Sequence, residues 1–208
     1  MSIFVGGLIG AVLGAVVWRA AGLFAGRFQP ERIVGGLTSL PAAVTLAGMA
    51  AWGAVVACGA ANLAQAASAL VVVAVLAAIA LTDLQVRQIP NALVLALLAW
   101  AAVQVVAFGR PAAQSAGLGL LAGGGLFVVI ALISRGAMGA GDVKLAAALG
   151  AVFGWPVILP VLLYGIIAGG VAALILLVTR RAGRKSFFAY GPYLALGAAV
   201  VLAQGLLA

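Results

Sequence analysis

The 208-residue chain has no histidine, one cysteine and only three acidic side chains. A Ser-His-Asp or Cys-His nucleophile, a histidine-ligated zinc ion and a cysteine cluster therefore all lack their parts. No disulfide forms within the chain, because Cys58 has no partner. Charged residues make up 7% of the chain, against about 25% in an average soluble protein, and 67% of the residues are hydrophobic. Such a composition cannot cover an apolar core with polar groups, so it excludes a soluble domain and predicts a membrane protein.

Uncharged apolar runs predict an all-α polytopic membrane protein with about eight transmembrane helices, since a crossing takes about 20 apolar residues. A single integral-membrane domain covers residues 1–208. The predicted spans are Ile3–Phe24, Leu40–Ala61, Ala66–Thr82, Asn91–Phe108, Ser115–Ile133, Val143–Gly154, Val157–Thr179 and Tyr190–Leu207. One helix from Leu145 to Thr179 would be too long and would enclose Pro156, so a break is predicted there. No basic segment precedes the first span, which is expected to remain as an anchor.

The basic residues predict the topology. With eight helices and both termini on the outer face, 10 of the 11 Lys and Arg residues lie in or beside cytoplasmic connections. The exception is Arg110, which lies outside. Seven helices would place the cluster at 180–185 outside. The net charge of +8 is spread over short loops, so the expected partner is the lipid bilayer rather than nucleic acid. A stripe formed by Gly6, Gly10 and Gly14 is typical of close helix packing.

The three acids differ in their surroundings. Glu31 lies in a polar turn, where a solvated partner of Arg32 or Arg27 is expected. Asp83 and Asp142 each lie at the end of an apolar run, where an ionisable group is costly and indicates a function. The predicted topology places both at the cytoplasmic edge of the membrane, so the two carboxyl groups are expected to meet.

Two carboxyl groups at low dielectric share one proton, so that one takes a proton from water while the other donates one to a carbonyl oxygen, as in aspartic proteases. Structural alternatives exist for each acid. Asp83 could be a helix-end acid paired with Arg87, and Asp142 could cap a helix that begins at Val143.

The flanking residues favour a site. Pro90 disfavours a continued helix after Asp83 and suits the start of the next one. Gly139 and Gly141, before Asp142, allow a close backbone approach to a substrate strand, although glycine also serves ordinary turns.

Two motifs resemble those of the type IV prepilin peptidases, within the wider group of Gly-x-Gly-Asp intramembrane aspartic proteases. The first is Asp83 followed by Arg87-Gln88-Ile89-Pro90-Asn91, and the second is Gly139-Ala140-Gly141-Asp142-Val143-Lys144-Leu145. The segments Gly7–Arg19 and Tyr190–Gly197 are similar to the first and last helices of that family. A lone Gly-x-Gly-Asp motif would be weak evidence for this resemblance, whereas the two motifs together with the shared topology are specific evidence for it.

The resemblance implies cleavage of the basic leader from type IV prepilin or pseudopilin precursors, at the cytoplasmic face of the bacterial inner membrane. By resemblance, Asp83 and Asp142 are the catalytic pair. The residues implied to bind substrate or shape the site are Gly139, Gly141, Lys144, Arg87, Pro90 and Asn91. Lys144 either lowers the pKa of a nearby carboxylate or anchors at lipid headgroups, and Arg87 has the same anchoring alternative.

Two departures from the family bear on activity. Many members carry two Cys-x-x-Cys pairs between the first two helices, similar to a zinc site, and also N-methylate the trimmed pilin. The corresponding Ala25–Ser39 has no cysteine. No metal or other cofactor is therefore expected, and methyl transfer is left open. Ala137 also stands where glycine is commoner in the family. The sequence does not define the oligomeric state.

A competing hypothesis is a small proton-coupled transporter that uses Asp83 and Asp142 as a proton relay. Transporters often contain repeats and bind substrate near the bilayer midplane. This chain shows no clear repeat, and both acids lie at one edge of the predicted bundle. A noncatalytic scaffold would leave the acid pair unexplained.

Overall fold

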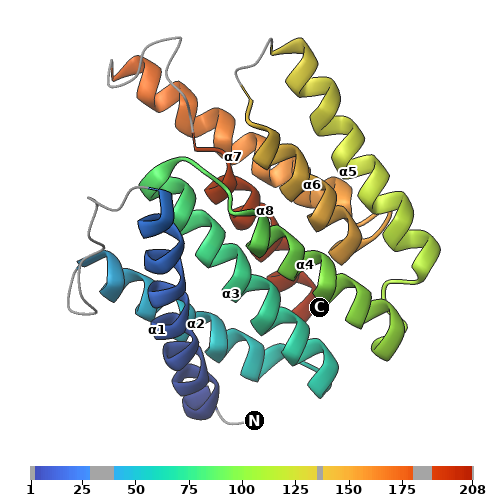
Figure 1. Ribbon diagram of the computed structural model, residues 1–208. Coiled ribbons are helices and arrows are strands. Elements are labelled where there is room, and N and C mark those ends of the chain that lie inside the picture. Colours follow the sequence, from blue (N-terminus) through green and yellow to red (C-terminus); the bar gives the residue numbers. More distant parts are fainter. Residues whose placement is uncertain (1–2, 29–39, 135–137, 180–188, 208) are drawn as a thin grey trace.

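The computed structural model describes residues 3–28, 40–134, 138–179 and 189–207, and all regular structure within them is helical (Figure 1). The elements are α1 (Ile3–Phe28), α2 (Leu40–Gly59), α3 (Leu63–Val86), α4 (Asn91–Val103), the π-helix η1 (Gln104–Phe108), α5 (Ala113–Ile133), α6 (Ala140–Phe153), α7 (Ile158–Val178) and α8 (Gly191–Leu207). The predicted all-α fold is confirmed.

Each predicted span coincides with a helix. Six are long and apolar enough to cross a membrane by length and composition: α1, α2, α3, α4 with η1, α5 and α7. The other two are shorter, with 14 residues in α6 and 17 in α8. The predicted break at Trp155–Pro156 is confirmed, because α6 ends at Phe153 and α7 begins at Ile158. One detail differs, since the predicted span Asn91–Phe108 changes from α to π geometry at Gln104.

Close packing at small residues joins the helices in pairs. The predicted glycine stripe of α1 lies against α2, where a methyl group on Gly10 would collide with the backbone carbonyl of Met49. In the same way Gly119 of α5 and Gly150 of α6 leave no room for a methyl group at either position. Small side chains thus let helix backbones approach, which is the usual source of packing energy between helices in lipid.

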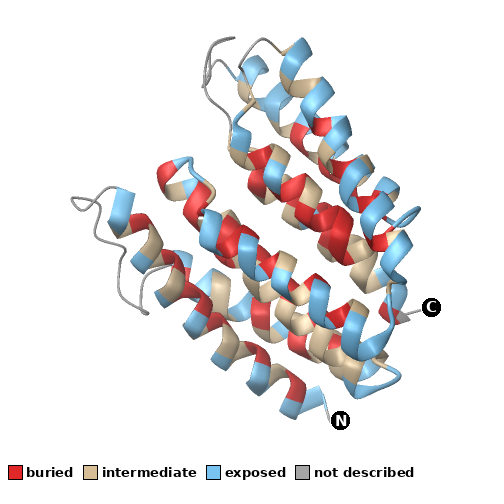
Figure 2. Cartoon of the chain, turned by 45° about the vertical axis from the view of Figure 1, so that its right-hand side comes forward, coloured by how far each residue is buried: buried red, intermediate tan, exposed pale blue. Residues whose placement is uncertain are grey.

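The main core draws on α1 and on α3 to α8, and Ile79, Leu97, Phe127 and Leu145 are among its fully buried residues. Figure 2 shows buried residues along the inward faces of the helices and exposed residues along their outer faces. Many exposed side chains are large and apolar, such as Phe4 at 90% exposure. A broad apolar exterior is the surface that lipid covers.

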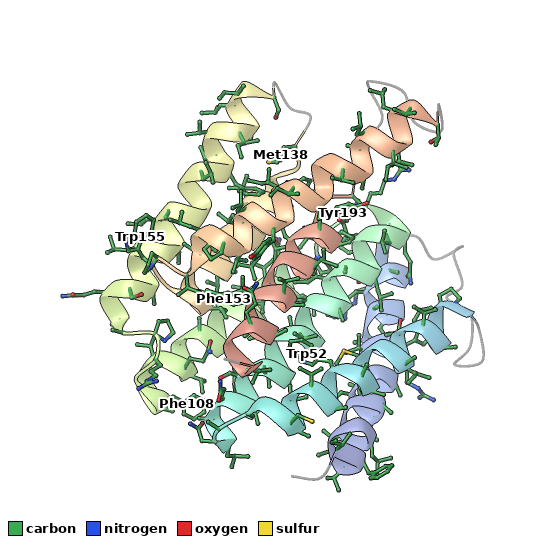
Figure 3. The ribbon with its side chains drawn as sticks, turned by 180° about the vertical axis from the view of Figure 1, so that it is seen from behind. Trp52, Phe108, Met138, Phe153, Trp155 and Tyr193 are labelled. Atoms are coloured by element: carbon green, nitrogen blue, oxygen red, sulfur yellow. The ribbon has the colours of Figure 1, made fainter. Side chains whose placement is uncertain are left out.

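Helix ends that are distant in sequence meet at one end of the bundle, at the top of Figure 1, where α3 ends and α6 begins. Figure 3 shows Met138, just before α6, and Tyr193, in the first turn of α8, toward this end, and Phe108 toward the other. The expectations for Glu31, Arg32, Arg135 and the basic cluster at 180–185 lie outside the described residues.

Candidate active site

A cavity of about 340 Å³ lies where these helix ends meet. Its lining residues are Phe28, Asp83, Arg87, Gln88, Ile89, Asn91, Gly139, Gly141, Asp142 and Lys144. The structure therefore brings together every site residue predicted from the sequence except Pro90, which is buried and precedes α4. Asp83 and Asp142, far apart in sequence, share the wall of one cavity.

Asp83 lies in the last turn of α3 and is 4% exposed. Its Oδ2 atom accepts a hydrogen bond of 2.9 Å from the backbone N–H of Gly191, the first residue of α8. Arg87 ends α3 in the left-handed conformation (φ 54°), and its backbone N–H donates to the carbonyl oxygen of Asp83 at 2.8 Å. The hydrogen bond that joins Arg87 to Asp83 is thus a backbone cap of the helix.

Asp142 lies in the first turn of α6 and is 8% exposed. The expectation that it would cap a helix beginning at Val143 is wrong, because α6 begins at Ala140 and Gly139 is the capping residue. Glycine has no side chain with which to cap, so the Asp142 carboxylate reaches back to the backbone N–H of Gly139. This contact is one half of a capping box, in which the third helical residue satisfies the N-cap amide.

Burial and a neighbouring charge act together on Asp142. Asp142 lies on α6, which is not one of the six helices long and apolar enough to cross a membrane. Loss of hydration on burial, reinforced by the negative charge of Asp83, raises the pKa of Asp142 from 3.8 to about 6. The electrostatic effect of one carboxylate on the other is what a pair that shares a proton requires.

The turn between α3 and α4 forms another wall of the cavity. Pro90 immediately precedes α4, as its place in the sequence predicted. A methyl group on Gly141 would lie 3.1 Å from Cβ of Ile89, so glycine lets α6 approach this turn. Lys144 Nζ donates to Asn91 Oδ1 at 3.2 Å. The Lys144 ammonium thus links α6 to the first residue of α4.

Sequence reasoning did not assign Gly191 to the site, although it lay within a segment that resembled the family. Glycine directly before Pro192, at a helix start next to a buried acid, was the available signal. Tyr190 packs its ring on that of Phe127, with centroids 5.9 Å apart. Burial, with the charge of Asp142, raises the pKa of Tyr190 to about 12, which keeps its hydroxyl neutral.

The arrangement is suited to proton transfer. Two buried carboxyl groups from separate helices border one open cavity, and each is held by a backbone amide. Within the described ranges, no three side chains of His, Cys, Asp or Glu gather in a cluster that could hold a metal ion. Fold and site together define a multi-pass helical membrane protein with a buried carboxyl pair.

Comparison with known proteins gives the family. The sequence model of the Type IV leader peptidase family matches residues 70–174, half of the chain, and includes both aspartates. The chain belongs to this family. No solved structure matches it significantly.

Its relatives include three proteins named prepilin leader peptidase/N-methyltransferase. The protein of Burkholderia pseudomallei (strain K96243) is 39% identical over 64% of this chain and 44% of its own length. That of Stutzerimonas stutzeri is 32% identical over 62% of this chain and 47% of its own length. That of Bacillus subtilis (strain 168) is 26% identical over 66% of this chain and 55% of its own length. The chain thus spans about half the length of the curated relatives it matches.

Proposed function

We propose that the protein is an intramembrane aspartic endopeptidase that removes the leader from type IV prepilin or pseudopilin precursors. The observation that carries this proposal is the convergence of Asp83 and Asp142 on one cavity, both of them buried and drawn from helices distant in sequence. Membership of the leader peptidase family and the names of the relatives support the choice of substrate.

We assign the shared proton to Asp142, whose pKa is raised by burial and by the Asp83 charge, and the ionised role to Asp83, whose Oδ2 atom accepts the N–H of Gly191. The Asp83 carboxylate takes a proton from a water molecule, and the oxygen of that water attacks the carbonyl carbon of the scissile peptide. Asp142 donates its proton to the carbonyl oxygen, which gives a neutral tetrahedral diol. Proton transfer from Asp83 to the amide nitrogen then breaks the C–N bond, while a diol hydroxyl returns its proton to Asp142.

The place of the cavity fits a substrate with one apolar and one polar part. Both acids lie at the end of the bundle rather than halfway along the helices. The apolar helix of a precursor would lie against the exposed apolar faces, and its leader would extend beyond the helix ends. In the topology that the basic residues predict, this end faces the cytoplasm of a bacterial cell, in the inner membrane.

The direct test mixes purified protein with one prepilin precursor and locates the cut by mass. We expect the wild type to release the leader at one bond and Asp83→Asn to release none. Intact precursor with the wild type, accompanied by proton flux in liposomes, would instead support the transporter hypothesis. The product mass also shows whether the new N-terminus gains a methyl group when a methyl donor is present.

A further inference from the structure

The start of α8 touches Asp83 through the backbone of Gly191. Gly191 is buried, and its N–H donates to Asp83 Oδ2 at 2.9 Å. A methyl group on Gly191 would lie 2.9 Å from the same oxygen and 3.4 Å from Cβ and Cγ of Asp83. A side chain at residue 191 would therefore force the Asp83 carboxylate or the start of α8 to shift.

We propose that Gly191 is a positioning residue for Asp83, whose N–H fixes the carboxylate so that Oδ1 is the oxygen that activates water. This inference rests on the proposed function and extends it to a helix outside the matched family segment, which ends at residue 174. Gly191 acts through Asp83 and makes no contact with the reacting atoms.

The position of Asp83 on its helix explains why an amide donor is needed. Asp83 lies in the C-terminal turn of α3, where unpaired carbonyl groups and the negative end of the helix dipole disfavour an anion. The N-terminus of α8 supplies the opposite field together with one hydrogen bond. Hydrogen bonds to ionised groups are about twice as strong as neutral ones.

Other titratable and charged groups lie at the same end of the bundle as Asp83. Among the described residues, the titratable and charged groups there are Asp142 and Lys144 on α6, Arg87 after α3, Tyr190 and Tyr193 at the start of α8, and Arg27 on α1. Replacing Gly191 changes none of these side chains. A shift in the titration of Asp83 on that replacement therefore reports on the amide contact.

The chain has only two aspartates, so protein labelled with ¹³C at the aspartate carboxyl carbon gives two carboxyl signals. Asp83→Asn and Asp142→Asn assign them. We expect Gly191→Ala to raise the titration midpoint of the Asp83 signal by about one pH unit relative to wild type, the effect of one lost hydrogen bond to a charged group. On precursor cleavage, kcat is expected to fall at least about tenfold, with KM within about twofold.

Two other glycines of α8 provide matched controls. Gly205→Ala enters open space and should leave both signals and kcat unchanged. Gly197→Ala collides with the backbone of Val161 and Gly165 on α7, so it should lower the melting temperature without moving the Asp83 midpoint. An unmoved midpoint in Gly191→Ala, or an equal shift in Gly197→Ala, overturns the inference.

A second measurement does not need a folded Gly191 variant. In wild-type protein labelled with ¹⁵N-glycine, the Gly191 amide proton should lie downfield and follow the titration of Asp83, and Asp83→Asn should abolish that dependence. A Gly191 amide that ignores pH overturns the inference as well. If the amide and carboxyl signals behave as expected but the wild type cleaves no precursor, the positioning contact stands and the proposed function fails.

Discussion

A double-mutant cycle of Asp83→Asn, Asp142→Asn and the double variant distinguishes a pair that shares one proton from two carboxyls that act independently. Positioned acid or base groups typically contribute about 10²–10⁴-fold to a rate. Independent groups would lose the product of their effects, about 10⁴–10⁸-fold in the double variant. In a shared pair either substitution breaks the acid–base couple, because one carboxyl group has no partner left to exchange the proton with, so the double variant should be no slower than a single one. The coupling energy is then about 2.7–5.4 kcal/mol, at 1.36 kcal/mol per tenfold.

The structure indicates that these variants fold. Asparagine matches aspartate in shape, and its amide oxygen can accept the N–H of Gly191 or of Gly139 in place of the carboxylate. The assay is initial cleavage rate of a precursor peptide, read by mass.

Thr82→Val is the matched control. Thr82 is a fully buried neighbour of Asp83, and its hydroxyl donates only to the carbonyl oxygen of Ala78, at 2.8 Å. This variant should keep its rate within about threefold. A double aspartate variant whose loss equals the product of the single losses refutes the shared proton.

Four further outcomes follow from the same geometry. Because burial penalises ionised Asp142, Asp142→Asn should stabilise the fold above about pH 6. The gain in the free energy of unfolding is at most about 3 kcal/mol for a pKa raised from 3.8 to about 6. A melting temperature that does not rise at pH 8, or a gain that persists at pH 3, contradicts this. Wild-type kcat/KM should fall about tenfold per pH unit above about pH 6, as Asp142 loses its proton, and a flat profile to pH 8 opposes that role. Gly150→Ala should cost about 1–3 kcal/mol of stability by forcing α6 away from α5, whereas Gly117→Ala, which meets open space, should cost none in the same thermal melts. Lys144→Met removes the exposed bond to Asn91, so it should cost less than about 1 kcal/mol and leave the pH profile in place; a displaced profile would instead show Lys144 tuning a carboxylate.

Much of the fold was predictable because charge and proline mark where lipid-covered helices stop. Helix boundaries were less accurate, since apolarity marks only the length a bilayer would cover. For example, α3 extends past Thr82 to Val86, and it starts at Leu63 because Asn62 caps it, with the Asn62 side chain accepting from the Gln65 N–H at 2.9 Å. A search for uncharged runs therefore misses the polar turns with which a helix begins or ends at the membrane edge.

The two aspartates were predictable by residue type, since an acid at the end of an apolar run requires an explanation. Gly139 was also predicted, through the Gly-x-Gly-Asp motif, but Gly191 was not, because it acts through a backbone N–H group that every residue except proline carries. The three-dimensional approach of the start of α8 to the Asp83 carboxyl group is what assigns Gly191 a role among the 29 glycines of the chain.

The helix ends also bear on how the pair divides its roles. Asp142 lies at the start of α6, where the helix field favours an anion, and Asp83 lies at the end of α3, where it does not. From these two helices alone, Asp83 would be the residue to hold the proton. Two effects oppose that preference: the buried N–H of Gly191 favours the ionised form of Asp83, and burial beside the Asp83 charge favours the protonated form of Asp142. Under the proposed mechanism the catalytic unit therefore comprises three helices, and both carboxyls can be present in residues 70–174 while a group that helps to set their roles lies beyond them.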